Sequence, residues 1–283
     1  MTRTTRRLIL YVAILIFLAV GYVAVLYAQG YRYSFTEAGF SRTGAVSLRA
    51  NTQAEVLING VFKDNTSFMT NSSSVSGLLP GVYTVSVQKE NYSKWQKKVT
   101  IQEGFVQDFP HVLLLPLTGE DNVNVMKEIE SLLYPPTPSP TATPSATTKP
   151  TSTPKPTPTP SPSPSPTPDT SSQYYIDHGS LYVQSITGDG PVSIATGVTE
   201  VFKSSDGQKL TWALGNQVWL YWLNDQNDQP FHKHGDLAVI GRFNTSIKAL
   251  AWFRDSDHVA IDVSGSLKVI ELDTRGGQNT ISL

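Results

Sequence analysis

The most prominent pattern in the chain is an unbroken apolar run from Leu8 to Ala28, preceded by Arg3, Arg6 and Arg7. Its 21 residues contain no charged residue and no Asn, Gln or Pro. At about 1.5 Å of rise per residue, a helix of this length spans a hydrocarbon core about 30 Å thick. The run therefore predicts a transmembrane helix over residues 8–28, with residues 1–7 on one side of it.

A cleaved signal peptide is the alternative interpretation of the same run. It would need an apolar stretch of about 7–15 residues and then a small-x-small cleavage site. This run is longer, and its best exit, Leu26-Tyr27-Ala28, has a large residue where a small one is needed. An uncleaved anchor is therefore expected. The arginines before the span outnumber Arg32 just after it, which predicts a cytoplasmic N-terminus and an extracytoplasmic location for everything after Gly30.

Residues 35–117 alternate between apolar and polar positions, the pattern of half-buried β-strands. Asn59-Gly60 follows one such strand and predicts a tight hairpin, because both turn positions need positive φ angles. A second turn is expected at Gly77–Gly81. The expected strands are Ala45–Arg49, Glu55–Ile58, Val82–Val87, Lys98–Ile101 and Val112–Leu115.

The order of these segments resembles a PEGA domain over about residues 44–116. The matching elements are Ala-Glu-Val-Leu-Ile-Asn-Gly at 54–60, Gly-Leu-Leu-Pro-Gly-Val-Tyr-Thr-Val-Ser-Val at 77–87, Asn91-Tyr92 and Val99-Thr100-Ile101. The Pro-Glu-Gly-Ala that names the family corresponds to residues 52–54 and their neighbours, so the naming proline is missing. The resemblance implies a short extracytoplasmic β-sandwich of prokaryotes, a structural or binding module that brings no catalytic residues.

Two segments without strand patterning follow. Residues 120–134 predict a short helix, since four apolar residues share one face. Residues 135–172 are almost only Pro, Thr and Ser, with 14 of the 19 prolines, and lack the apolar side chains that offset ordering entropy. They predict a disordered, extended linker that reaches on the order of 100 Å and holds the last domain away from the membrane. The apolar face of the helix consists of Val125, Ile129, Leu132 and Leu133.

The last part of the chain aligns with itself at an offset of 49 residues. Residues 198–212 align without a gap on residues 247–261, so that Asp206 falls on Asp255, and an earlier partial copy at 179–183 matches 265–269. Each copy reads as strand, Asp-containing turn, strand, Gly or Asn turn, strand. A period of about 40–50 residues in this pattern is typical of propeller blades. The pattern resembles β-propellers with a Ser-x-Asp-Gly turn and predicts a propeller-like domain over residues 173–283.

This propeller-like domain is expected to be incomplete. About 110 residues make two to two and a half blades, too few to close a ring, and open sheet edges invite pairing. Three explanations are open: a truncated sequence, several chains that complete one ring, or sheets that pack as something other than a propeller. Truncation is favoured, because the chain stops at Leu283 on an expected strand.

The composition of the chain and the motifs that it lacks exclude several classes of function. The chain has 22 Lys+Arg and 23 Asp+Glu, and a net charge of −1 gives little support for nucleic-acid binding. The absence of cysteine excludes disulfides, thiolate metal sites and cysteine nucleophiles. Neither a Gly-x-Ser-x-Gly motif nor a phosphate-binding glycine loop occurs. We therefore predict a protein that is not an enzyme, with no catalytic residues, cofactor or metal site.

Two polar clusters are candidates for chemistry, and a structural interpretation is favoured for both. His232 and His234 could place two imidazoles on one strand face, but no third metal ligand is indicated, so a solvated loop is expected. Asp255, Asp257 and His258 fall on a turn between strands, where Asp bonds its local backbone.

Tryptophans concentrate in the last domain and offer a binding alternative. Trp212 and Trp252 lie on repeat strands and are expected in the core between blades. Trp219 or Trp222 could be exposed, because adjacent strand positions face opposite ways, and could stack on the sugars of a wall polymer.

These patterns predict an all-β, single-pass envelope protein of the cell membrane that displays a binding or scaffolding domain outside the cell. Its expected partners are the lipid bilayer, through residues 8–28, and wall polymers or surface proteins. The alternative is the anchored accessory part of an envelope hydrolase whose catalytic portion lies outside this sequence. The ligand, the oligomeric state and the blade count are left open.

Overall fold

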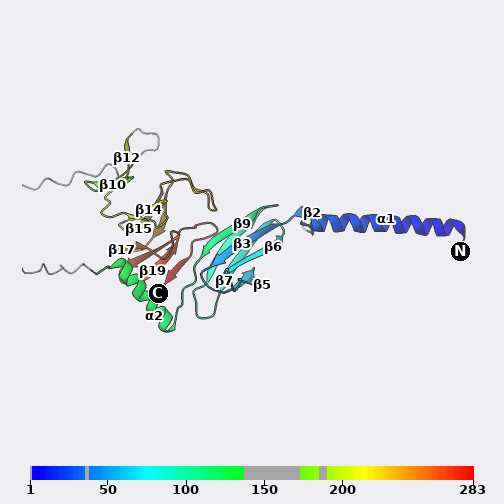
Figure 1. Cartoon of the computed structure of the whole chain (residues 1–283), viewed down its shortest axis with the longest axis horizontal. Helices are drawn as coiled ribbons and strands as arrows, with labels where there is room; N and C mark the ends of the chain where they lie inside the picture. Colours follow the sequence, from blue (N-terminus) through cyan, green and yellow to red (C-terminus); the bar gives the residue numbers. More distant parts are fainter. Residues whose placement is uncertain (1, 36–37, 137–172, 185–189) are drawn as a thin grey trace, which may run out of the picture.

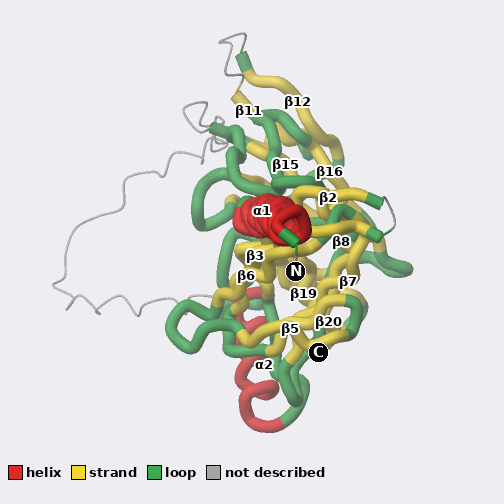
Figure 2. Tube along the Cα trace, turned by 90° about the vertical axis from the view of Figure 1, so that its right-hand side faces the viewer, coloured by secondary structure: helices red, strands yellow, loops and turns green. Residues whose placement is uncertain are grey.

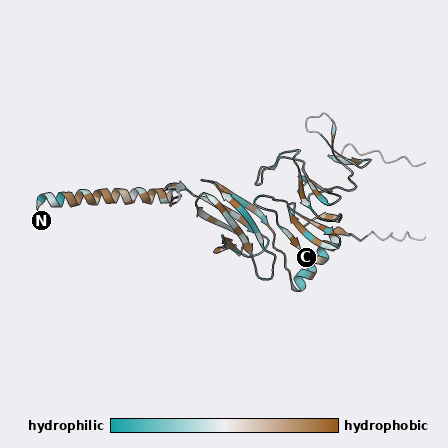
Figure 3. Ribbon diagram, turned by 180° about the vertical axis from the view of Figure 1, so that it is seen from behind, coloured by the Kyte–Doolittle hydropathy of each residue, from teal (hydrophilic) through white to brown (hydrophobic). Residues whose placement is uncertain are grey.

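The computed structural model describes residues 2–35, 38–136, 173–184 and 190–283. The chain is mostly β-sheet, with one long helix at its N-terminus, α1 (Arg3–Ala28), that extends away from the sheets (Figure 1). Helix α1 is long and apolar enough to span a membrane, and none of its side chains is buried. Its apolar surface continues along nearly its whole length (Figure 3). The helix begins where the Thr2 side chain accepts a hydrogen bond from the Thr5 amide.

A small hairpin follows the helix directly. Its strands are β1 (Tyr31–Ser34) and β2 (Gly39–Arg42), paired antiparallel with Tyr33 opposite Phe40. Thr43 fixes the base of the hairpin to the end of the helix, because its amide and its hydroxyl both donate to the Gly30 carbonyl.

Residues 44–116 form two sheets around one core, and we call this part the two-sheet unit. Alternation places apolar side chains inside, as in β3, where every second residue is buried. Asn59 and Gly60 both have positive φ angles and make the tight turn between β4 and β5. One sheet has the order β6 (Ser72–Leu78), β3 (Gly44–Ala50), β9 (Val106–Val112), and the other β5 (Val61–Asn65), β4 (Glu55–Ile58), β7 (Gly81–Gln88), β8 (Trp95–Ile101).

The sequence predicts the last strand of this unit at Val112–Leu115, but the structure has it earlier, as β9 at Val106–Val112. Strand β9 ends at Val112, and residues 113–115 continue as a buried segment outside any sheet. Side chains satisfy its backbone there: the Leu114 amide donates to Asn51 Oδ1 and the Leu115 amide to Ser93 Oγ. A run of apolar residues alone could not distinguish a buried segment of this kind from a strand.

From residue 174 onward the chain forms three antiparallel sheets, which we call the sheet stack. Each sheet is a simple meander in chain order. The predicted repeat is visible in their positions: β14 and β18 differ by 49 residues at both ends, as do β15 and β19. The strands are β10 (Tyr174–Asp177), β11 (Ser180–Gln184) and β12 (Pro191–Thr196); β13 (Phe202–Lys203), β14 (Lys209–Leu214), β15 (Gln217–Trp222) and β16 (Leu237–Arg242); and β17 (Ile247–Trp252), β18 (His258–Val263), β19 (Ser266–Glu271) and β20 (Thr280–Ser282).

Helix α2 (Gly119–Leu133) covers one end of the sheet stack (Figure 1). Separate apolar clusters fill the space between the first and second sheets and between the second and third. A further cluster joins the third sheet to α2 through Val125, Ile129 and Leu133. Leu132, expected on the same face, is exposed instead. The helix therefore occupies the face of the third sheet on which another sheet would pack.

The two-sheet unit and the sheet stack are in direct contact, which differs from the expectation that a linker holds them apart. Lys97 on β8 is buried, with its ammonium 3.0 Å from Glu271, and Trp95 Nε1 donates to the same carboxylate. Gly276 has φ +63°, and a Cβ there would lie 2.1 Å from the Lys98 carbonyl, so only glycine fits this close approach. Most of the linker, residues 137–172, lies outside the described residues.

Candidate functional site

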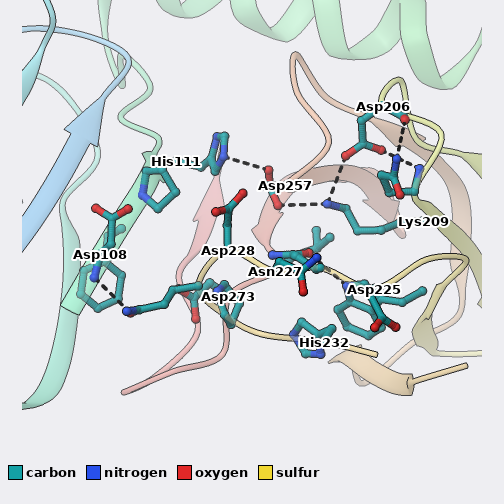
Figure 4. A pocket seen from close by; sticks show the side chains of 18 of the residues that line it. Asp108, His111, Asp206, Lys209, Asp225, Asn227, Asp228, His232, Asp257 and Asp273 are labelled. Carbon is teal, nitrogen blue, oxygen red and sulfur yellow. Dashed lines mark hydrogen bonds and ion pairs between the residues drawn. The ribbon is translucent and has the colours of Figure 1, made fainter. Parts of the chain in front are cut away.

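A pocket of about 500 Å³ lies where β9 of the two-sheet unit meets the turns and loops at one end of the second and third sheets. Its size is in the range of small-molecule sites. Figure 4 shows polar side chains from three regions converging on it, among them Asp108 and His111 from β9. The pocket exists only because the two parts of the protein pack together.

An aromatic wall closes one side of the pocket. Trp222 ends β15, and the ring of His232 stacks on it with centroids 3.8 Å apart. Trp222 Nε1 donates to Gln226 Oε1 at 3.2 Å, which fixes the loop between β15 and β16 against the ring. Phe109 supplies a second aromatic side chain from β9.

A charged network forms the opposite wall. The Lys209 ammonium lies 3.4 Å from Asp206 and 3.3 Å from Asp257, and His111 Nε2 lies 3.3 Å from the other oxygen of Asp257 (Figure 4). Burial favours the neutral form of Asp206, but hydrogen bonds from Ser204 and the Gln208 amide and the charge of Lys209 outweigh it and lower the pKa of Asp206. The wall thus places two carboxylates around one buried lysine.

Arg275 holds together three residues that line the pocket. Its guanidinium contacts the Asp273 carboxylate at 2.7 Å, the Asp108 carbonyl at 2.7 Å and Gln229 Oε1 at 2.8 Å. It joins the loop after β19, strand β9 and the loop between β15 and β16. A neutral residue could not hold three acceptors in this way, because only a guanidinium offers a planar set of donors.

The pocket is acidic and hydrophilic. Asp108 and Asp228 line the pocket, and among the described residues their side chains have no hydrogen-bond or ion-pair partner. Amide side chains add donors and acceptors: Gln208, Asn224, Gln226, Asn227 and Gln229. This lining can hydrogen-bond a ligand rich in hydroxyl or amine groups while the aromatic wall contacts its apolar face.

The two histidines singled out by the sequence have different partners. His232 is part of the aromatic wall, which differs from the solvated loop expected for it. His234 Nδ1 instead contacts the Leu223 carbonyl at 2.7 Å. Across the described ranges, no group of three His, Cys, Asp or Glu residues is arranged to hold a metal ion.

The Asp255 to His258 turn shows the local bonding that the sequence predicts. Asp255 Oδ1 accepts from the Asp257 amide at 2.8 Å, and His258 Nδ1 lies 3.0 Å from the same carboxylate. Asp257 differs from the expectation, because its side chain leaves the turn and lines the pocket. The sequence indicated only a turn role for Asp257, since its partners Lys209 and His111 lie in other parts of the chain.

The tryptophans divide between core and pocket. Trp212 is buried and Trp252 is partly buried between sheets, in the positions expected. Trp219 stacks on Trp212 with centroids 6.4 Å apart rather than standing free in solvent. Trp222, expected as a possible exposed platform, is also largely buried, yet its ring borders the pocket.

No protein-family model matches the chain, and no curated protein matches it.

Proposed function

We propose that this chain is a non-enzymatic, membrane-anchored binding protein of the cell envelope. In this proposal α1 is an uncleaved membrane span, the N-terminus is cytoplasmic, and the two-sheet unit and the sheet stack lie outside. The span is supported by the length and exposure of α1, and the orientation by Arg3, Arg6 and Arg7 before it. The two-sheet unit and the sheet stack would then lie next to the extracytoplasmic face of the membrane that α1 spans.

We propose further that the two-sheet unit is a PEGA-like sandwich and the sheet stack a propeller-like array. The first assignment rests on the sequence elements described above, together with two sheets that share one core. The second rests on the 49-residue repeat and on meandering sheets packed face to face. In this reading α2 takes the place of a neighbouring blade on the third sheet.

The pocket between the two parts is the proposed binding site, and a saccharide unit of an envelope polymer is the proposed ligand. The observation that carries this is an aromatic wall, Trp222 with His232, in the same pocket as two carboxylates, Asp108 and Asp228, that have no partner within the described ranges. Sugars present hydroxyl donors at their edges and apolar C–H groups on their faces, which matches both walls.

Binding of soluble fragments of purified wall polysaccharide to the full chain in detergent tests the proposal. We expect Asp228→Asn to weaken binding about tenfold, because a hydrogen bond to a charged group contributes about 1.5 kcal/mol. Glu200→Gln is the matched control, since Glu200 is exposed and is not one of the residues that line the pocket. Calorimetry with all three proteins measures the dissociation constants. Equal affinities, or no binding to the unaltered protein, would reject a saccharide site in this pocket.

A further inference from the structure

The hairpin after α1 has the reverse of the polarity expected for a strand pair in water. Its serines, Ser34 and Ser41, are buried to 6% exposure each, whereas Tyr33 and Phe40 are exposed. Phe35, at the end of β1, is 91% exposed. A hairpin packed on a soluble protein places its large apolar side chains inside and its polar ones outside. The exposed aromatic face therefore needs an apolar environment that the described part of the chain does not supply.

The exposed rings are continuous with the end of α1. Tyr27, one turn before the helix ends, meets Phe40 edge to face at 6.4 Å. Phe40 meets Tyr33 at 5.5 Å, and Tyr33 meets Phe35 at 5.1 Å. Four rings thus form one connected aromatic strip from the helix onto the hairpin. Aromatic side chains concentrate at membrane–water interfaces, where one end of the ring contacts lipid and the other water.

The direction of the hairpin fits this environment. Figure 2 looks along α1, and β2 lies across the view beside the end of the helix. A hairpin perpendicular to a membrane-spanning helix runs parallel to the membrane plane. Phe105 is exposed on the loop between β8 and β9. This loop lies at the hairpin end of the two-sheet unit, since the Gly104 amide donates to the Thr43 carbonyl.

Two arginines flank the aromatic strip. The Arg32 guanidinium lies 4.6 Å from the centre of the Tyr27 ring, and its Nη1 donates to the Tyr31 carbonyl. Arg42 is exposed at the base of β2. Neither has a carboxylate partner among the described residues. Lipid phosphates would supply the missing anions at the depth where such side chains extend from an interface.

We propose that the hairpin of residues 31–42 lies in the interfacial layer of the lipid leaflet where α1 leaves the membrane. Tyr33, Phe35 and Phe40 contact the acyl boundary, and Arg32 and Arg42 contact the head-group phosphates. The inference rests on the proposed function to the extent that α1 must span the bilayer. It adds a second attachment, which fixes the tilt of the two-sheet unit, and with it the pocket, relative to the membrane.

Single labels test this directly, because the chain has no cysteine of its own. Three variants, Leu15→Cys, Phe35→Cys and Phe68→Cys, each carry one environment-sensitive fluorophore in the full chain reconstituted into phosphatidylcholine vesicles. Leu15 lies in the middle of α1 and reports on the span. Phe68 is the matched control: it is 86% exposed, but lies beside Asn71, which accepts from Ala50 at the opposite end of β3 from the hairpin.

The inference predicts blue-shifted emission and loss of iodide quenching at positions 15 and 35, but not at position 68. A nitroxide lipid with its spin probe near the head group should quench position 35 more than position 15, and a probe deep in the acyl chain should do the reverse. If position 15 is shielded by lipid and position 35 is as accessible to iodide as position 68, the inference is wrong and the membrane anchor stands. If position 15 itself is accessible to iodide, the proposed anchor fails and the hairpin has no bilayer to contact.

Discussion

The second and third sheets contain two copies of one turn, and the copies use different chemistry on the same backbone plan. In the first copy, Asp206 is followed three residues later by Lys209; in the second, Asp255 is followed three residues later by His258. Both basic side chains are nearly buried, at 5% and 3% exposure. The acid stays in place in both copies, while the base changes from a long flexible amine to a short planar ring.

The replacement of lysine by histidine determines which carboxylates each turn can contact. Lys209 contacts its own Asp206 and also Asp257 in the other copy, so it joins two sheets and forms part of the pocket wall. Among the residues that the structure describes, the polar partner of the His258 ring is the carboxylate of its own Asp255. Burial favours the neutral form of Asp255, but the hydrogen bond and charge of His258 outweigh it and lower the pKa of Asp255. Lys209 therefore joins the two copies in the pocket wall, which the second copy also lines through Asp257, whereas His258 bonds within its own turn.

Removing the lysine should have the largest effect. Lys209→Met keeps the length of the side chain but leaves two carboxylates without their shared cation. We expect the free energy of unfolding to fall by about 3 kcal/mol, as when one partner of a buried ion pair is removed. Urea unfolding of the full chain in detergent, followed by tryptophan fluorescence, measures the change.

Lys248→Met is the control for this substitution. Lys248 lies exposed on β17 and has no ion-pair partner among the described residues, so its loss should change stability by less than about 0.5 kcal/mol. If both variants lose the same small amount, Lys209 does not join the sheets in the way the geometry indicates.

Replacing Asp255 or Asp206 should reduce stability less than replacing Lys209, and Asp255 should have the larger effect of the two. Asp255→Asn should cost about 1.5 kcal/mol, because the buried His258 loses its one charged hydrogen-bond partner. Asp206→Asn should cost about 0.5 kcal/mol, because Asp206 is more exposed and Lys209 keeps Asp257. The same urea titrations rank the two variants. The reverse order would mean that Lys209 depends on its own turn and that Asp257 contributes little.

The sequence predicts local structure well where one face of a strand is buried. Four of the five strands expected in residues 44–116 are present, and the 49-residue repeat places β14 and β18 in equivalent positions. The failures concern contacts between distant segments. Lys97 lies in phase with the apolar residues Trp95 and Val99 on the buried face of β8, where its ammonium pairs with Glu271 of the sheet stack. The strand pattern alone gave no sign of that distant partner.

The pocket could not be predicted from the sequence, because it too depends on contacts between distant segments. His111, Lys209 and Asp257 come from three separate elements, and no spacing along the chain relates them. His232 was a candidate for a metal site, yet its role comes from a ring stacked on Trp222, ten residues earlier. The linker was expected to separate the two parts, because composition describes how a segment extends but not whether the domains that it joins bind each other.

The smallest predicted effect is a shared dependence on pH. The pKa values of Asp206 and Asp255 are both lower in the folded protein than the ordinary value of about 3.9. Both carboxylates therefore stabilise the fold at pH values above about 4, and this contribution is lost as the pH falls through their folded pKa values. Stability measured by urea titration should decline over that acidic range in the unaltered protein, and less steeply in the double variant Asp206→Asn and Asp255→Asn. Equal slopes in the two proteins would show that other carboxylates control the acid response, and that the conserved position of the acid in both turns serves backbone geometry rather than charge.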